Sequence, residues 1–141
     1  MPIQMDIPAL EQFLLEWFPQ VADEIRIEAL DHQGAVVWLK VGDHHLRPGG
    51  TVSGPSIFLL ADVAVYLALL ARIGPQALAV TTNCTINFLR KPGSADIQAR
   101  SAILKLGKTL CVSEVGVYSG DSPDPVAHAV LTYSIPPAKL G

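Results

Sequence analysis

The stretch that decides the fold is Pro55 to Ala71, PSIFLLADVAVYLALLA, in which Asp62 is the only charged residue. A membrane span needs about 20 apolar residues and tolerates a lone carboxylate at its centre only at a high cost. Ser53 is a good N-cap, Pro55 fits the first helical turn, and Gly74-Pro75 ends the pattern. These features predict a long helix buried in a protein core rather than a membrane span.

The segments on either side of this helix predict a second helix and six strands. Apolar residues spaced three and four apart predict a short amphipathic helix over 7–21. Period-two alternation predicts a hairpin from strands 24–30 and 35–41, then four longer strands in consecutive hairpins over 77–89, 96–106, 109–118 and 126–135. A helix that is apolar on nearly all sides must be covered on most of its surface. The predicted fold class is therefore α+β, a single domain over residues 1–141 in which a curved antiparallel sheet of five to six strands wraps a long central helix, with a short N-terminal helix.

The composition argues against several classes of protein. Half of the 141 residues are hydrophobic, and the net charge is −3 with no cluster among the ten Lys and Arg, so no nucleic-acid partner is expected. Cys84 and Cys111 lie in no zinc-ligand or disulfide spacing. Asp6, Glu11 and Glu16 replace the basic segment of a signal peptide, so we expect a cytoplasmic protein with no membrane partner.

Asp62 is the strongest candidate for chemistry, because burying an unpaired carboxylate among apolar side chains costs several kcal/mol. It is predicted to lie at the floor of a ligand slot as a general base or nucleophile, the alternative being a structural carboxylate that accepts a hydrogen bond from a loop N–H or from the hydroxyl of a partner. The loop RPGGTVSG, from Arg47 to Gly54, brings glycines to the helix N-terminus, where a free N–H can hold an oxygen that gains negative charge. A plain turn followed by an N-cap would explain the same glycines.

The strand from Val80 to Phe88 carries uncharged polar residues at alternate positions. Strict alternation places Thr81, Asn83, Thr85 and Asn87 on one face, which predicts a wet interface or a ligand-lining surface, although a simple exposed face would have the same pattern. His44 and His45 lie near the glycine loop. Adjacent histidines more often point apart than act together, so no metal or catalytic role is assigned to them.

Four segments resemble the PaaI-type branch of the hotdog-fold acyl-CoA thioesterases: GTVSGPSIFLLAD (50–62), AVTTNCTINFLRKP (79–92), ILKLGKTLCVSEVGVYS (103–119) and AHAVLTYSI (127–135). The resemblance implies a central helix wrapped by an antiparallel sheet, and a homodimer with active sites at its interface. Whether dimers pair further into tetramers is left open.

The resemblance also implies roles for individual residues. The family's acidic residue falls on Asp62, and the glycine whose N–H polarises the thioester carbonyl falls on Gly54. The family's histidine before that glycine is here Ser53, its next glycine is Pro55, and its upstream asparagine is Arg47. The hydroxyl residue that the family supplies from the other subunit matches Thr81.

The predicted function is hydrolysis of an acyl-CoA thioester by Asp62, Gly54 and Thr81, without a metal or cofactor. The predicted substrate contacts are the acyl-pocket residues Phe58 and Tyr66, the loop and strand residues Arg47, Ser53 and Asn83, and the phosphate-binding residues Arg90, Lys91 and Lys108. One alternative is a binding protein for acyl-CoA or another hydrophobic ligand that has lost turnover. A second is a hotdog dehydratase, which would pair His45 with Asp62.

Overall fold

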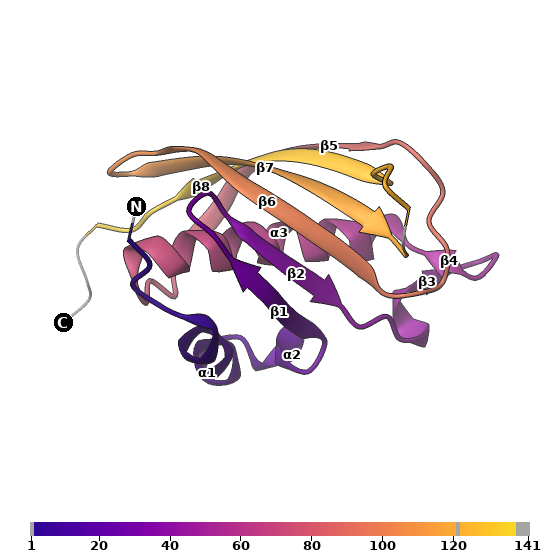
Figure 1. Cartoon of the computed structure of the whole chain (residues 1–141), viewed down its shortest axis with the longest axis horizontal. Coiled ribbons are helices and arrows are strands. Elements are labelled where there is room, and N and C mark those ends of the chain that lie inside the picture. The colour runs from indigo at the N-terminus through magenta and orange to yellow at the C-terminus, as the bar shows by residue number, and fades with distance from the viewer. Residues whose placement is uncertain (1, 121, 138–141) are drawn as a thin grey trace.

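Helix α3 (Gly54–Ile73) forms the centre of the molecule, and a six-stranded antiparallel sheet curves around it (Figure 1). The computed structural model describes residues 2–120 and 122–137. The remaining elements are α1 (Ile7–Trp17), α2 (Pro19–Ala22), β1 (Ile25–Leu30), β2 (Ala35–Leu39), a 3-10 turn (Asp43–His45), β3 (Leu46–Arg47), β4 (Thr51–Val52), β5 (Val80–Phe88), β6 (Ile97–Leu106), β7 (Leu110–Ser119) and β8 (Ala127–Ser134). The predicted α+β class, the central helix and a main sheet of five to six strands are confirmed, whereas the short strands β3 and β4 were not predicted.

Helix α3 is buried on nearly every side, as its sequence requires. It is long and apolar enough to cross a membrane, with a mean hydropathy of 2.0, yet 78% of that stretch is buried inside the molecule. Ser53 caps the helix by accepting a hydrogen bond from the backbone N–H of Ser56. One stripe of the helix is less covered: Pro55 is exposed, and Phe58 and Asp62 are half-buried. This stripe runs beside β5, which forms an edge of the sheet.

The strand order is β1-β2-β6-β7-β8-β5, which corrects one prediction. The hairpins β1–β2, β6–β7 and β7–β8 form as expected, but β5 pairs with β8 instead of with its sequence neighbour β6. A two-residue turn can join only strands that are adjacent and antiparallel. The segment 89–96 between β5 and β6 is longer than such a turn, so it can cross the end of the sheet past β8 and β7. In this crossover the Gly93 N–H donates to Ser119 Oγ at 3.1 Å, and the Gly93 carbonyl oxygen accepts from the Val52 N–H at 3.0 Å.

A β-bulge at Thr82 corrects the predicted face of β5. Thr81 pairs with Tyr133 and Asn83 pairs with Thr132, so Thr82 is an extra residue and the alternation changes phase there. Thr81 therefore lies on the helix-facing side, opposite the buried Tyr133. The other polar residues of the predicted row face away from the helix, opposite the alternate positions of β8: Asn83, Thr85 and Asn87.

The ends of helix α3 are tied to other elements. At its N-terminal end, the segment interpreted from its sequence as a glycine-containing loop forms most of the small β3–β4 hairpin. At its C-terminal end, the buried Arg72 donates to the carbonyl oxygens of Ala68, at 2.9 Å, and of Asp31 in the β1–β2 turn. The predicted N-terminal helix is divided into α1 and α2 at Phe18, because Pro19 cannot donate the hydrogen bond that would continue α1.

Candidate active site

The carboxylate of Asp62 is held by two hydroxyl groups from neighbouring strands. Thr81 Oγ1 on β5 donates to Asp62 Oδ1, and the Tyr133 hydroxyl on β8 donates to the same oxygen at 2.8 Å. Tyr133 also lies 3.1 Å from the backbone oxygen of Asp62. The second carboxylate oxygen, Oδ2, accepts no hydrogen bond from the residues that the structure describes. One oxygen is therefore fixed, and the other is available to a ligand or to water.

Burial raises the pKa of the Tyr133 phenol, and the negative charge of Asp62 raises it further. Tyr133 is therefore a neutral hydrogen-bond donor at physiological pH. Cys84, on the helix-facing side of β5, also has a raised pKa because of burial and the nearby Asp62 charge. The group able to act as a base at this position is thus the carboxylate and not the thiol.

Asp62 lines a pocket of about 180 Å³ between α3, β5 and the α1–α2 junction. Thr81 and Tyr133 join it at the polar end of this pocket. The other lining residues are mostly apolar: Phe18, Val63, Tyr66, Ala77, Ala79 and Val80. A carboxylate at one end of an apolar pocket suits a ligand with a reactive polar group and a hydrophobic tail.

Gly54 lines a different pocket, of about 390 Å³, at the start of helix α3. Its backbone N–H donates to no acceptor within the described residues, so it can bind a ligand oxygen. Three cationic side chains line the same pocket: Arg47, Arg90 and Lys91. Gly54 and Asp62 are eight residues apart on one helix, which separates them by about 12 Å along the axis. Within one chain they cannot both contact one carbonyl group.

The structure places the other predicted residues as follows. Thr81 contacts Asp62 of its own chain, so the expectation that Thr81 reaches Asp62 from the other subunit is corrected. Phe58 lies one turn before Asp62 on α3 and lines neither pocket, whereas Tyr66 lines the Asp62 pocket. Ser53 serves as the helix cap. Like Phe58, Ser53 lines neither pocket, and two further predicted substrate contacts also lie outside both: Asn83 on the outer face of the sheet, and Lys108 in the β6–β7 turn.

Two functional candidates were missed by the sequence analysis. Tyr133 continues the inward-facing series of β8, and a buried tyrosine in such a series needs a polar partner for its hydroxyl, which could have indicated its role. Phe18 directly precedes the proline that ends α1, and only the packing of α1 against α3 brings its ring to the pocket. No pattern in the sequence connects it with Asp62.

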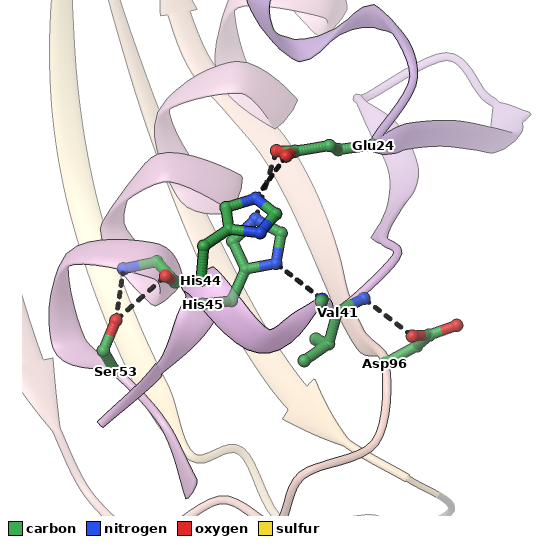
Figure 2. A network of polar contacts seen from close by, with 8 residues as sticks. Glu24, Val41, His44, His45, Ser53 and Asp96 are labelled. Atoms are coloured by element: carbon green, nitrogen blue, oxygen red, sulfur yellow. Dashed lines mark hydrogen bonds and ion pairs between the residues drawn. The ribbon is translucent and has the colours of Figure 1, made fainter. Parts of the chain in front are cut away.

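A second polar cluster joins Glu24, His44 and His45 (Figure 2). His44 Nε2 lies 2.5 Å and His45 Nε2 lies 3.1 Å from the Glu24 carboxylate oxygens. His45 Nδ1 accepts a hydrogen bond from the Gly42 N–H, so the proton of the neutral ring is on Nε2 and points at Glu24. A metal ion would need the lone pair of that same nitrogen. The contacts therefore describe a hydrogen-bond network rather than a preformed metal centre.

This network supports the start of helix α3. The backbone oxygen of the buried His45 accepts a hydrogen bond at 2.8 Å from the N–H of Ser53, the N-cap residue. Burial alone would raise the pKa of Glu24, but the hydrogen bonds from His44 and His45 outweigh it and lower that pKa below its ordinary value of 4.5. Glu24 is thus an anion that anchors the loop preceding Gly54.

Comparison with known proteins agrees with the fold. The sequence profile of the thioesterase superfamily matches residues 49–126. Comparison with curated protein sequences gives no match. A candidate thioesterase from Silicibacter sp. TM1040, known as a crystal structure, is 48% identical with a TM-score of 0.90, and the match covers 97% of this chain and 96% of that one.

Two more distant structures share the architecture. A variant of the phenylacetic acid degradation protein PaaI from Thermus thermophilus is 28% identical with a TM-score of 0.71, over 83% of this chain and 98% of that one. Zebrafish thioesterase superfamily member 2 is 19% identical with a TM-score of 0.81, over 94% of this chain and 100% of that one, and at this identity the likeness shows the fold alone.

Proposed function

Because this chain belongs to the thioesterase superfamily and has its hotdog fold, we propose that it hydrolyses acyl-CoA thioesters to a free acid and CoA. The observation that carries the proposal is the Asp62 carboxylate, which is fixed through Oδ1 by two hydroxyls and open through Oδ2 at the end of an apolar pocket. A carboxylate held in this way can act as a general base or as a nucleophile.

As a base, Asp62 Oδ2 takes a proton from a water molecule, and the resulting hydroxide attacks the thioester carbonyl carbon. The carbonyl oxygen gains negative charge, which the Gly54 N–H stabilises. The tetrahedral intermediate then expels CoA as a thiolate, which receives the proton held by Asp62. If Asp62 attacks directly, its oxygen bonds to the carbonyl carbon, the C–S bond breaks and CoA leaves as a thiolate, which gives a mixed anhydride. Water then hydrolyses that anhydride, which regenerates the Asp62 carboxylate, releases the free acid and supplies the proton that the thiolate takes up.

The separation of Gly54 and Asp62 makes this mechanism a property of a dimer. Each group must lie about 3 Å from the reacting centre, whereas one helix holds them about 12 Å apart. Phe58 lies midway between them in sequence. Two antiparallel α3 helices related by a twofold axis near Phe58 would bring Gly54 of each chain opposite Asp62 of the other, as an isologous interface requires.

Two features of the surface support this dimer. The half-covered stripe of α3 contains both Phe58 and Asp62. Beside it, the free edge of β5 exposes the large apolar side chains of Val80 and Phe88, at 57% and 54%. An exposed sheet edge with apolar side chains is stable against aggregation only when it is covered or paired. A second copy on this face would cover both the edge and the stripe.

The pocket at Gly54 is suited to the CoA part of the substrate. Arg47, Arg90 and Lys91 present three positive charges around a helix N-terminus, and none of the described residues that line this pocket is a carboxylate. Guanidinium and ammonium groups are the side chains that bind phosphates most strongly. We propose that they hold the phosphates of CoA, which would explain why Arg47 stands where the family has an asparagine.

The alternatives make different demands on the structure. A dehydratase would need His45 beside Asp62, but its ring is 3% exposed and engaged with Glu24 and Gly42. A binding protein without turnover would use the same two pockets.

We also propose that the protein is cytoplasmic. The side chains of Cys84 and Cys111 form no disulfide, which agrees with this location because the cytoplasm keeps thiols reduced.

The experiment that tests the proposal follows free-thiol release from a panel of acyl-CoAs by the wild type and by Asp62→Asn, which preserves shape and removes the base. We expect kcat to fall roughly 100-fold or more. Asp23→Asn, a change at a carboxylate outside both pockets, is the matched control and keeps wild-type activity. Binding of acyl-CoA without any thiol release by the wild type would refute hydrolysis in favour of the binding protein.

A further inference from the structure

Three of the residues that line the pocket beside Asp62 are aromatic, and their rings pack against one another. The Phe18 ring packs edge-on against Tyr66, with centroids 6.5 Å apart, and Tyr66 stacks on Tyr133 at 6.1 Å. Since the Tyr133 hydroxyl contacts Asp62, these three rings form one wall that leads from the carboxylate to the α1–α2 junction. An acyl group whose carbonyl lies at Asp62 extends along this wall.

Phe18 is fixed in this wall by the local backbone. It is the C-cap residue of α1 and directly precedes Pro19, the first residue of α2, so it occupies the corner between the two helices. Its N–H donates to the Leu14 oxygen at 2.8 Å. The backbone of Phe18 is thus held by a hydrogen bond on one side and by a proline on the other, and its ring packs against Tyr66.

We propose that the wall made by Phe18 and Tyr66 restricts the substrate to compact acyl groups with an apolar end. The inference rests on the proposed function and adds the substrate class. The pocket measures about 180 Å³. A cavity of about 150 Å³ holds one benzene molecule, so this pocket accommodates an acyl group of about six carbons.

The wall offers no hydrogen-bond donor to the end of the acyl group. The Tyr66 hydroxyl donates to the Ala77 backbone oxygen at 2.9 Å, and burial raises the pKa of Tyr66 to about 12, which keeps it neutral. The remaining residues at this end have apolar side chains: Phe18, Val63, Ala77 and Ala79. A polar group at the end of the acyl chain would lose its hydrogen bonds to water and would not regain all of them in the pocket. Binding of such a substrate is therefore disfavoured.

The test measures kcat/KM for straight-chain acyl-CoAs from acetyl to dodecanoyl, together with 6-hydroxyhexanoyl-CoA. For the wild type, we expect kcat/KM to rise roughly fourfold per methylene up to about six carbons and to fall for longer chains. Hexanoyl-CoA should exceed 6-hydroxyhexanoyl-CoA by at least about tenfold. Phe18→Ala should move the optimum to chains longer by about two to four carbons, because it opens the end of the pocket.

Two further variants make the result decisive. Trp17→Ala removes a neighbouring ring that is 61% exposed and lines no part of the pocket, so the optimum should stay unchanged. Phe18→Leu retains much of the packing and should shift the optimum by less than Phe18→Ala, which covers the case in which the alanine variant does not fold. An unchanged optimum in folded, active Phe18 variants would overturn this inference alone. Absence of thiol release by the wild type with every substrate would refute the proposed function and this inference with it.

Discussion

Replacing Gly54 by proline removes a single backbone N–H from the proposed oxyanion site. The structure indicates that the helix tolerates the change. Gly54 is the first residue of α3, a position where proline is favoured because its missing N–H has no partner in the helix. Ser53, with φ −75° and ψ 155°, already has the extended conformation that a following proline requires. A Cβ at position 54 would lie 3.4 Å from the Phe88 ring, an ordinary contact.

The expected loss follows from the role of that N–H. Removing one donor from an oxyanion site reduces kcat by about 100- to 1000-fold, or about 2.7–4 kcal/mol of transition-state stabilisation. The matched control is Gly54→Ala, which adds the same Cβ before Pro55 but keeps the N–H. We expect the alanine variant to retain kcat within about tenfold of the wild type.

The assay is steady-state thiol release from the best acyl-CoA, with the free energy of unfolding measured by urea denaturation in parallel. The comparison is valid when the two variants unfold at similar urea concentrations. Equal rates for Gly54→Pro and Gly54→Ala would show that the Gly54 N–H does not stabilise the transition state, and the proposed role of Gly54 would be wrong.

Three further predictions concern other parts of the structure. Tyr133→Phe removes one of the two hydroxyls that hold Asp62 Oδ1, and we expect kcat to fall roughly 10- to 100-fold with little change in KM; a wild-type kcat would contradict this positioning role. Arg72→Met removes the side-chain donor to the Asp31 carbonyl oxygen in the β1–β2 turn, which should lower the free energy of unfolding by about 2 kcal/mol in urea denaturation, whereas wild-type stability would show that this bond is replaced. The lowered pKa of Glu24 means that its anion stabilises the fold above pH 4.5 and that this contribution is lost as the pH falls through the lowered value. Glu24→Gln should therefore be less stable than the wild type at pH 7 and show a smaller loss on acidification; parallel stability curves would exclude this linkage.

The main elements could be predicted from local patterns because each pattern has one physical solution. The charge of Asp62 in the middle of the apolar stretch favours a core helix over a membrane span, and the strands that follow alternate clearly enough to predict a sheet around it. Asp62 itself was identified because a carboxylate among apolar residues needs a partner. Of its two hydroxyl partners, Thr81 and Tyr133, the second depends on the pairing of β8 with β5.

The predictions that were wrong concern places where a small local difference, such as one extra residue in a strand, changes contacts between residues far apart in the sequence. A single extra residue at Thr82 reverses which side of β5 faces the helix, so Thr81 reaches Asp62 while Asn83 does not. The crossover after β5 could not be distinguished from a hairpin turn by its Pro and Gly alone. The position of Phe18 follows from how α1 packs on α3, which depends on the whole core rather than on adjacent residues.

The central claim, that each active site combines Asp62 of one chain with Gly54 of the other, is tested most directly in a heterodimer. Chains carrying Asp62→Asn and chains carrying Gly54→Pro are co-expressed with different affinity tags, and the mixed dimer is purified on both tags. Such a dimer contains one site with both wild-type groups and one site with neither. We predict that it releases thiol at about half the wild-type rate per dimer, although each variant alone is nearly inactive. A mixed dimer as inactive as its parents would contradict the shared site.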